Sequence, residues 1–138
     1  MSLYTAIATA TGGRNGHAET SDGLLKFDLS VPKGMGGPGK AGATNPEQLF
    51  ACGYAACFGG AMDFVANRDK IAAKDASVTA EVSFDAPPGK GFELSVVLRV
   101  KVPGMDRAEA EKLVAKAHEV CPYSKATRGN IPVELVVL

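Results

Sequence analysis

The feature that most constrains the fold is a long apolar stretch, residues 49–66, which directly follows a strong helix start. Asn45 can cap a helix, Pro46 suits its first turn, and Glu47 puts a carboxylate at the positive end of the helix dipole. These signals predict one long helix that is capped by Asn45 and ends near Asn67. The rest of the chain has to fold so that this helix is removed from water.

Two environments can take a helix that is apolar nearly all round: a membrane and a protein interior. Asp63, the many small residues and the lack of a second apolar span favour the protein interior. The 15 Lys and Arg residues balance the 15 Asp and Glu residues, so the chain lacks the basic excess that attracts nucleic acid or anionic lipid. We therefore expect neither a nucleic acid nor a membrane as a partner.

Strand patterns flank the helix on both sides, in a chain of 138 residues that is the size of one domain. The predicted order is βββ-α-ββ-α-β, which makes residues 1–138 a single α+β domain. A glycine-rich loop, residues 34–42, precedes the long helix. The other predicted elements are strands at 4–11, after the 12–16 turn and at 24–29, and a hairpin of 77–84 and 92–102. An Asp106–Glu109 capping box opens a second, amphipathic helix. After a break at Cys121-Pro122 and a short turn to Gly129, the last strand is at 133–138. The predicted inner face of the second helix consists of Ala110, Leu113, Val114 and Ala117.

The three cysteines, Cys52, Cys57 and Cys121, are the first candidates for chemistry. The N-terminal residues lack the pattern of a secretory signal, so we expect the cytoplasm, where thiols stay reduced. Cys52 and Cys57 point about 140° away from each other on the predicted helix and cannot pair while it is intact. A redox pair must therefore join Cys121 to one of them; otherwise the cysteines are inert buried thiols. Without a Cys-x-x-Cys pair or nearby histidines, we expect no metal.

Three stretches of the chain carry a resemblance to a known family. They are residues 10–17 (ATGGRNGH), 45–58 (NPEQLFACGYAACF) and 120–131 (VCPYSKATRGNI). In sequence, order and spacing they resemble the organic hydroperoxide resistance (Ohr) branch of the Ohr/OsmC family, over essentially the whole chain. The resemblance implies an OsmC-like fold, with antiparallel-rich sheets around a long buried hydrophobic helix, in an intertwined homodimer.

The resemblance also implies an activity and the residues that perform it. The family reduces organic and fatty-acid hydroperoxides to alcohols, with dithiols of lipoyl groups as the reductant and without metal, haem or flavin. Carried over residue by residue, Cys57 is the peroxidatic thiol and Cys121 the resolving thiol. Arg14 and Glu47 match the family's catalytic arginine and glutamate. Cys52 departs from the family, which usually has a small residue such as alanine there; we expect a buried small residue, and the alternative is a backup thiol.

These residue types suit the chemistry. Because the thiolate is the nucleophile and a free cysteine has a pKa of about 8.5, Cys57 needs a nearby cation, which Arg14 can supply. Glu47 can hold that guanidinium by a bidentate pair. A sulfenic acid on Cys57 would condense with Cys121 to a disulfide before it is over-oxidised. From the residues alone the opposite assignment stays open, since the turn at Pro122 can offer helix amides to Cys121.

Glu47 and Cys57 lie too far apart on one helix to share a small site. They are ten residues apart, which is about 15 Å along a straight helix. Either the helix bends near Gly53, or a second subunit supplies the arginine and the glutamate, as in a symmetric dimer.

Two other functions stay open at this stage. One is the OsmC branch of the same family, with a broader peroxide preference, although the Cys121-Pro122-Tyr123 context favours the Ohr branch. The other is a non-catalytic carrier of apolar ligands whose cysteines are merely buried. Fast consumption of the thiols by peroxide distinguishes an enzyme from a carrier.

Overall fold

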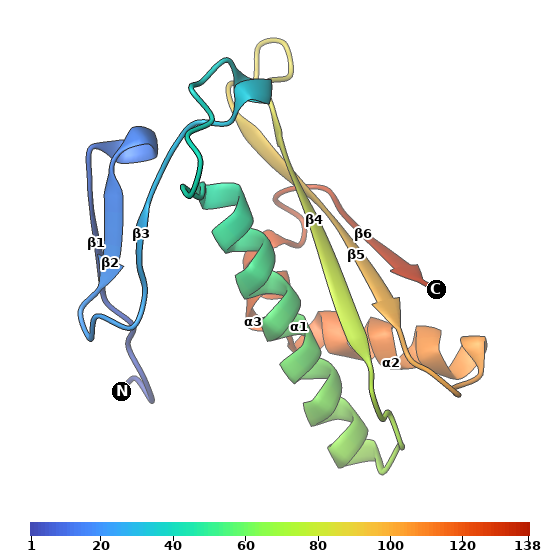
Figure 1. Cartoon of the computed structure of the whole chain (residues 1–138). Helices are drawn as coiled ribbons and strands as arrows, with labels where there is room; N and C mark the ends of the chain where they lie inside the picture. Colours follow the sequence, from blue (N-terminus) through green and yellow to red (C-terminus); the bar gives the residue numbers. More distant parts are fainter. The chain divides into compact units, whose positions relative to one another are not determined.

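The computed structural model describes all 138 residues, and the chain forms two compact units, Met1–Leu49 and Phe50–Leu138. One helix, α1 (Pro46–Asp69), begins in the first unit and continues through the second (Figure 1). Asn45 caps this helix as predicted, because its side-chain oxygen accepts the Gln48 backbone N–H at 2.9 Å. The helix ends within two residues of the predicted end.

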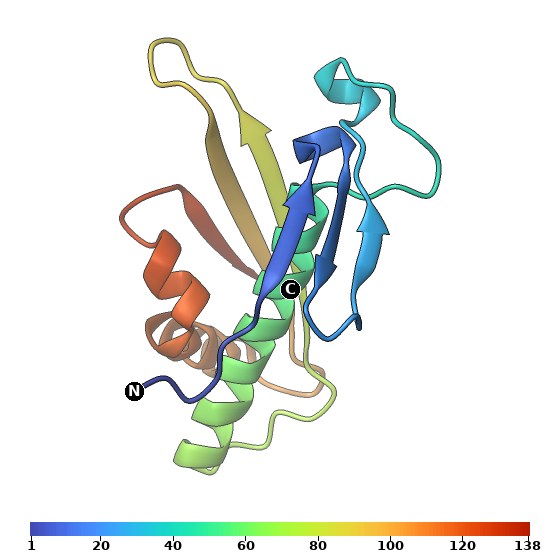
Figure 2. The ribbon, with the colours of Figure 1, turned by 90° about the vertical axis from the view of Figure 1, so that its left-hand side faces the viewer.

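The first unit contains a three-stranded antiparallel sheet (Figure 2). Pairing starts at Ala8 and not at residue 4, so the predicted first strand is shorter than expected. Leu29 is the only apolar side chain of this unit that is buried, and the unit therefore has almost no core of its own. The elements are β1 (Ala8–Thr11), β2 (His17–Thr20) and β3 (Lys26–Asp28), with two short 3-10 helices, η1 (Gly13–Asn15) and η2 (Lys33–Met35).

The second unit combines a mixed sheet with helices. β4 (Ser77–Asp85) and β5 (Glu93–Lys101) form the predicted antiparallel hairpin, and β6 (Val133–Val137) pairs with β5 in parallel. Burial alternates along β4, so one face of the sheet packs inward, as its period-two pattern predicts. Two helices, α2 (Arg107–Val120) and α3 (Pro122–Thr127), connect β5 to β6.

One apolar core holds the second unit together. The inward face of α1 packs with residues of β5 and α2, and Tyr54, Phe58 and Leu113 are fully buried in this core. The long helix is thus a core helix, but only one of its faces is buried within the chain, since Phe64 is 59% exposed. By length and composition alone α1 also meets the criteria for a membrane span, which core helices of soluble proteins meet as well.

Two details predicted for the C-terminal half are wrong. The segment after Cys121, predicted as a turn, forms α3, because Pro122 occupies a first-turn position where its fixed φ favours a helix and its missing N–H is no loss. The order is therefore βββ-α-ββ-αα-β. Asp106 stands at the N-cap of α2, but its side chain makes no capping hydrogen bond, so the predicted capping box does not form.

The predicted inner face of α2 is confirmed by the burial of Ala110, Leu113, Val114 and Ala117.

Truncation of a core leucine tests this packing. Leu98 of β5 is fully buried, whereas Leu138 at the end of the chain is mostly exposed. Leu98→Ala should lower the free energy of unfolding by about 2–5 kcal/mol, because it removes buried methyl groups and leaves a cavity. Leu138→Ala should lower it by less than about 0.5 kcal/mol. Urea unfolding at a fixed protein concentration measures both, and equal losses would contradict the core described above.

Candidate active site

Two of the three cysteines are in contact. The sulfur atoms of Cys57 and Cys121 are 3.6 Å apart, and the Cys121 thiol donates to the Cys57 sulfur. All three cysteines are reduced, and since a disulfide bond is about 2.05 Å long, the pair would have to approach by about 1.5 Å to bond. Of the two cysteines on α1, it is Cys57 that meets Cys121. Cys52 is exposed, so the expectation that it is a buried small residue is wrong for this chain.

Proline fixes the position of Cys121. This residue has an extended backbone and serves both as the C-cap of α2 and as the N-cap of α3. Its N–H still bonds to the Ala117 carbonyl at 2.9 Å, but Pro122 has no N–H with which to continue the helix. The chain therefore turns at this point, and the fully buried Cys121 side chain reaches the sulfur of Cys57 on α1.

The second unit does not activate Cys57 by itself. Burial raises the pKa of the Cys57 thiol, and the backbone N–H of Tyr123, which bonds to the sulfur, lowers it by less. No cation is among the groups that shift this pKa. At neutral pH the residues Phe50–Leu138 alone therefore leave Cys57 as a thiol.

An apolar hollow of about 470 Å³ opens at Cys57. Its lining on α1 follows helical spacing, so these residues share one face of the helix. Two small residues line it beside the thiol, which leaves room for an apolar group to approach the sulfur. The hollow is lined by Cys57, Gly60, Ala61, Phe64, Val120 and Pro122.

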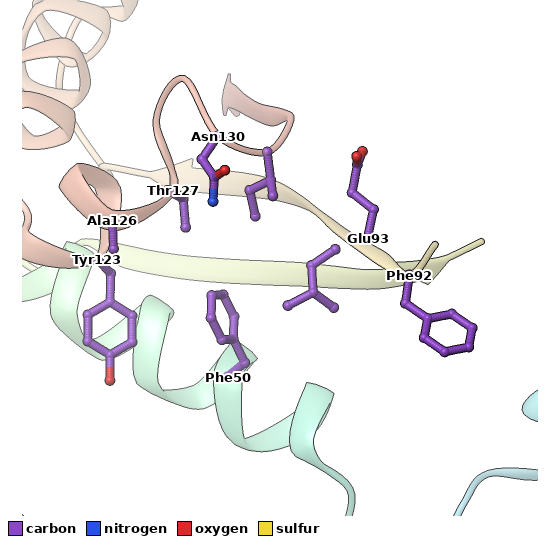
Figure 3. Close-up of a pocket in the computed structure, with 9 residues that line it drawn as sticks. Phe50, Phe92, Glu93, Tyr123, Ala126, Thr127 and Asn130 are labelled. Carbon is purple, nitrogen blue, oxygen red and sulfur yellow. The ribbon is translucent and has the colours of Figure 1, made fainter. Parts of the chain in front are cut away.

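A larger hollow, of about 600 Å³, lies in the same unit and contains neither cysteine (Figure 3). Figure 3 shows the Phe50 ring extending from α1, with Tyr123 beside it and Phe92 at the opposite end. Tyr123 packs closely on Gly53, where an added Cβ would lie 3.1 Å from the tyrosine hydroxyl oxygen. A side chain at this position would force the ring to shift by a few tenths of an ångström. The lining residues are Phe50, Phe92, Glu93, Leu94, Tyr123, Ala126, Thr127, Asn130 and Ile131.

Arg14 and Glu47 form a bidentate ion pair in the first unit. Two guanidinium nitrogens of Arg14 donate to the two carboxylate oxygens at 2.9 and 2.8 Å. These hydrogen bonds hold the pKa of the Glu47 carboxyl below its ordinary value, although partial burial opposes this. The same hydrogen bonds raise the pKa of Arg14. Both groups are therefore ionised at neutral pH, and the pair holds a cation in a fixed place.

Glycines shape the hairpin tip that carries Arg14. Gly12 and Gly13 have φ angles of 75° and 58°, in the left-handed region that favours glycine. A Cβ on Gly16 would collide with the carbonyl oxygen of Thr11. The predicted turn between β1 and β2 is confirmed, and it forms η1 with Arg14 at its centre.

The start of α1 holds Glu47 in place. The Thr44 N–H donates to the Asp28 carbonyl at 2.9 Å, which ties the residues before the helix to β3. The Thr44 hydroxyl donates to the Gln48 side-chain oxygen at 2.6 Å. Because β3 pairs with β2, backbone hydrogen bonds connect the segment that carries Glu47 to the hairpin that carries Arg14.

The four predicted site residues thus form two pairs. Cys57 and Cys121 belong to Phe50–Leu138, and Arg14 and Glu47 belong to Met1–Leu49. α1 continues through residue 53 without interruption. No group of three or more His, Cys, Asp or Glu side chains is arranged to hold a metal ion.

A buried polar network that was not predicted from the sequence lies beside the cysteine pair. Tyr54 of α1 bonds through its hydroxyl to Ser124 and Thr127 of α3, and His118 of α2 bonds to Ser124. His118 is therefore part of a specific polar contact. The available signal was a tyrosine in an apolar helix, because a buried tyrosine hydroxyl requires a partner.

The chain is similar to a known protein family and to proteins named for organic hydroperoxide resistance. The family model described as OsmC-like protein matches residues 37–136. An organic hydroperoxide resistance protein of Xanthomonas axonopodis pv. citri is 57% identical over 136 residues, which cover 98% of this chain and 94% of that protein.

Solved structures match over nearly the whole chain. A crystal structure of an organic hydroperoxide resistance protein from Legionella pneumophila matches with a TM-score of 0.93 and 60% identity, covering 99% of this chain and 98% of that chain. The structure of organic hydroperoxide resistance protein OhrB of Bacillus subtilis matches with a TM-score of 0.91 and 47% identity, covering 99% of this chain and 100% of that chain. These matches confirm the predicted α+β fold and the resemblance found in the sequence.

Removal of Arg14 should move the titration of Glu47. In the intact protein the Glu47 carboxyl should titrate below the ordinary value of about 4.3, because Arg14 bonds to its ionised form. In Arg14→Met, burial becomes the largest remaining influence on the pKa of Glu47, so the midpoint of its titration should rise above the ordinary value. Carbon-13 NMR of the side-chain carboxyl measures both midpoints.

Arg99→Met is the matched control, because Arg99 forms a similar pair with Glu81. It should leave the Glu47 midpoint unchanged, and a midpoint that stays low in Arg14→Met would contradict the assignment. The folded-state pKa of Glu47 lies below the unfolded one. The pair therefore stabilises the fold above the unfolded-state pKa, and this stability is lost as pH falls through the lowered folded-state pKa.

Proposed function

This chain belongs to the OsmC-like protein family, and we propose that it is a cysteine-based peroxidase that reduces organic hydroperoxides to alcohols. Its relatives in Xanthomonas axonopodis and Bacillus subtilis are named organic hydroperoxide resistance proteins. The observation that carries the proposal is the 3.6 Å contact between the sulfurs of Cys57 and Cys121 beside an apolar hollow. A redox pair next to an apolar opening suits an alkyl or fatty-acid hydroperoxide.

The first step is attack of the Cys57 thiolate on the peroxide. The sulfur takes one oxygen, the O–O bond breaks, and the departing alkoxide takes a proton to become the alcohol. The sulfur loses two electrons and becomes a sulfenic acid. Cys57 lines the hollow whereas Cys121 is fully buried, and this difference in access supports Cys57 as the attacking thiol over the reverse assignment.

The second step forms a disulfide. The Cys121 thiol attacks the sulfenic acid, the S–S bond forms, the S–O bond breaks and water leaves. An external dithiol then reduces the disulfide by exchange and becomes a disulfide itself. We assign this role to a lipoyl-type dithiol, for example on a lipoylated protein, in the cytoplasm that the sequence favours.

Arg14 stabilises the thiolate and the departing alkoxide, and Glu47 orients it. Along the uninterrupted helix α1, Glu47 and Cys57 of one chain are separated by about 15 Å. We therefore assign Arg14 and Glu47 to the Cys57 of a second subunit, in a homodimer with two equivalent sites. A cation beside Cys57 would then come from the partner chain.

Exposed apolar side chains support the homodimer. The first unit buries only Leu29 among its apolar side chains, and Leu24 is 83% exposed. On the outer side of α1, Phe64 is exposed as well. A three-stranded sheet with so small a core depends on further packing. A second copy would supply that packing, with residues 1–138 acting as one domain of the dimer.

A non-catalytic carrier of apolar ligands is the second candidate. The observation that favours it is the larger hollow, which has a volume of about 600 Å³ and contains neither cysteine. An apolar molecule could bind there without any reaction at sulfur. A carrier would bind lipid and keep slow, ordinary thiols.

Peroxide turnover distinguishes the two functions. With an excess of dihydrolipoamide, the protein should consume an alkyl hydroperoxide catalytically, and Cys57→Ser should abolish turnover because it removes the nucleophile. Cys52→Ala is the matched control and should keep the wild-type rate, since Cys52 lies outside the sulfur pair. A peroxide assay follows the reaction. Lipid binding without any turnover by the wild-type protein would support the carrier.

Mixed dimers test whether two subunits share each site. Arg14→Met should lose about a hundredfold or more in rate, because a fixed positive charge is removed from the transition state. Cys57→Ser should be inactive. After subunit exchange in an equal mixture, half of the dimers are mixed and each has one complete site, so activity should recover to about a quarter of the wild-type value. A mixture that stays inactive, although mass spectrometry shows mixed dimers, rules out a shared site.

A further inference from the structure

A chain of hydrogen bonds joins α1, α2 and α3 beside the cysteine pair. The Tyr54 hydroxyl oxygen lies 2.7 Å from the Ser124 hydroxyl oxygen and 3.0 Å from that of Thr127. The Ser124 oxygen lies 2.8 Å from Nδ1 of His118. Tyr54 and Ser124 are fully buried, and no buried side-chain polar atom lacks a partner. A buried network that is fully satisfied fixes the placement of the elements it joins.

The network and the sulfur pair occupy matching positions on the same two segments. Tyr54 precedes Cys57 by three residues on α1, and Ser124 follows Cys121 by three residues at the start of α3. Residues three apart on a helix are neighbours on one face. The Tyr54–Ser124 hydrogen bond and the Cys57–Cys121 contact therefore join the same two segments, about one helical turn apart.

Ring packing strengthens the same connection. The rings of Phe50, Tyr54 and Tyr123 lie with centroids 5.8 to 6.1 Å apart in all three pairs. Tyr123 also rests against Gly53. α3 is thus held on α1 by an aromatic cluster and, within it, by the hydrogen bonds of the buried Tyr54 hydroxyl with Ser124 and Thr127.

Disulfide formation requires the sulfur of Cys121 to move toward that of Cys57, and the hydrogen bond between Tyr54 and Ser124 limits how far the chain can move. The two sulfurs must approach by about 1.5 Å. The turn at Cys121 and Pro122 can supply that movement, because Pro122 donates no backbone hydrogen bond. Ser124 follows Cys121 within one helical turn and is held by Tyr54. The movement is therefore confined to Cys121 and Pro122, and the Cys121 thiol stays near the Cys57 sulfur.

We propose that Tyr54 and Ser124 are positioning residues for the resolving step: their hydrogen bond holds α3 on α1 so that the Cys121 thiol meets the Cys57 sulfenic acid before a second peroxide does. This inference rests on the proposed cysteine chemistry and adds to it the residues that serve its second step. The bond touches neither the peroxide nor the attacking thiolate. Tyr123, whose N–H bonds to the Cys57 sulfur, is also held on α1 by its ring contacts with Phe50 and Gly53. We therefore expect the first step to keep its rate when the bond is lost.

His118 gives the network its direction. Burial, and then the charge of Arg128, lower the pKa of His118, so its ring is neutral at physiological pH. Nδ1 can then accept from Ser124, and Tyr54 can donate to Ser124. The Thr127 hydroxyl has one proton for two acceptors, the Tyr54 oxygen at 3.0 Å and the Ser124 carbonyl at 3.3 Å. Arg128 also donates to the His118 carbonyl at 2.7 Å, which holds the end of α2 beside the network.

Tyr54→Phe tests the proposal because it removes the hydroxyl and keeps the ring. The reduced protein receives one equivalent of an alkyl hydroperoxide without reductant; stopped flow follows peroxide loss, and acid quench with peptide mass spectrometry follows disulfide formation. The disulfide should form about tenfold more slowly in Tyr54→Phe, which corresponds to about 1.4 kcal/mol for one buried hydrogen bond. Peroxide loss should keep its wild-type rate, and dimedone should trap more Cys57 sulfenic acid.

Further variants make the test specific. Ser124→Ala should show the same delay, and the double variant should be no slower than the slower single variant, because all three lack the same bond. Ser95→Ala removes a 3.0 Å hydrogen bond to Asp85 in the β4–β5 hairpin and should match the wild type. Circular dichroism confirms that each variant is folded.

Three outcomes would count against the proposal. If Tyr54→Phe and Ser124→Ala form the disulfide at the wild-type rate, the bridge does not position Cys121. If both steps slow together, the two residues are only structural. If the wild-type protein forms no disulfide at all, the proposed function fails, and this inference fails with it.

Discussion

Packing of one face of α1 against β5 and α2 determines where the sulfur atoms of Cys57 and Cys121 meet. Tyr54 and Phe58 are fully buried in this core, and because a helix turns by about 100° per residue, their burial places Cys57 at the edge of the core. α2 packs in the same core through Leu113, and the proline that ends it turns Cys121 toward α1. The 3.6 Å sulfur contact is thus a consequence of core packing and exists before any disulfide forms.

The position of Cys57 at the edge of an apolar core has two opposing effects. Apolar surroundings suit an organic peroxide, yet burial raises the pKa of Cys57 and disfavours its nucleophilic form. In the other unit, Glu47 holds the cation of Arg14 in a fixed place, on a hairpin that glycines shape. Under the proposed function, dimerisation brings the cation to the thiol. Assembly of the dimer and activation of the thiol then become one event.

Local signals account for what could be predicted from the sequence. The cap and apolar run of α1, the alternation of β4 and the inner face of α2 each lie within one segment, and all are confirmed. The α3 helix was missed because a six-residue helix after a proline has the same local pattern as a turn. Spacing alone leaves Cys121 able to pair with Cys52 or Cys57, and only tertiary packing selects Cys57. The Tyr54–Ser124 bridge joins residues 70 positions apart, which no local pattern reveals.

The central claim is that an organic peroxide converts the contact between Cys57 and Cys121 into a disulfide. The most direct measurement exposes the reduced protein for seconds to one equivalent of an alkyl hydroperoxide, with hydrogen peroxide in parallel, and then maps the alkylated peptides by mass spectrometry. We predict a peptide linked through Cys57 and Cys121, formed more readily with the alkyl hydroperoxide, and an alkylated Cys52. Three unreacted thiols would contradict the claim and favour a carrier of apolar ligands.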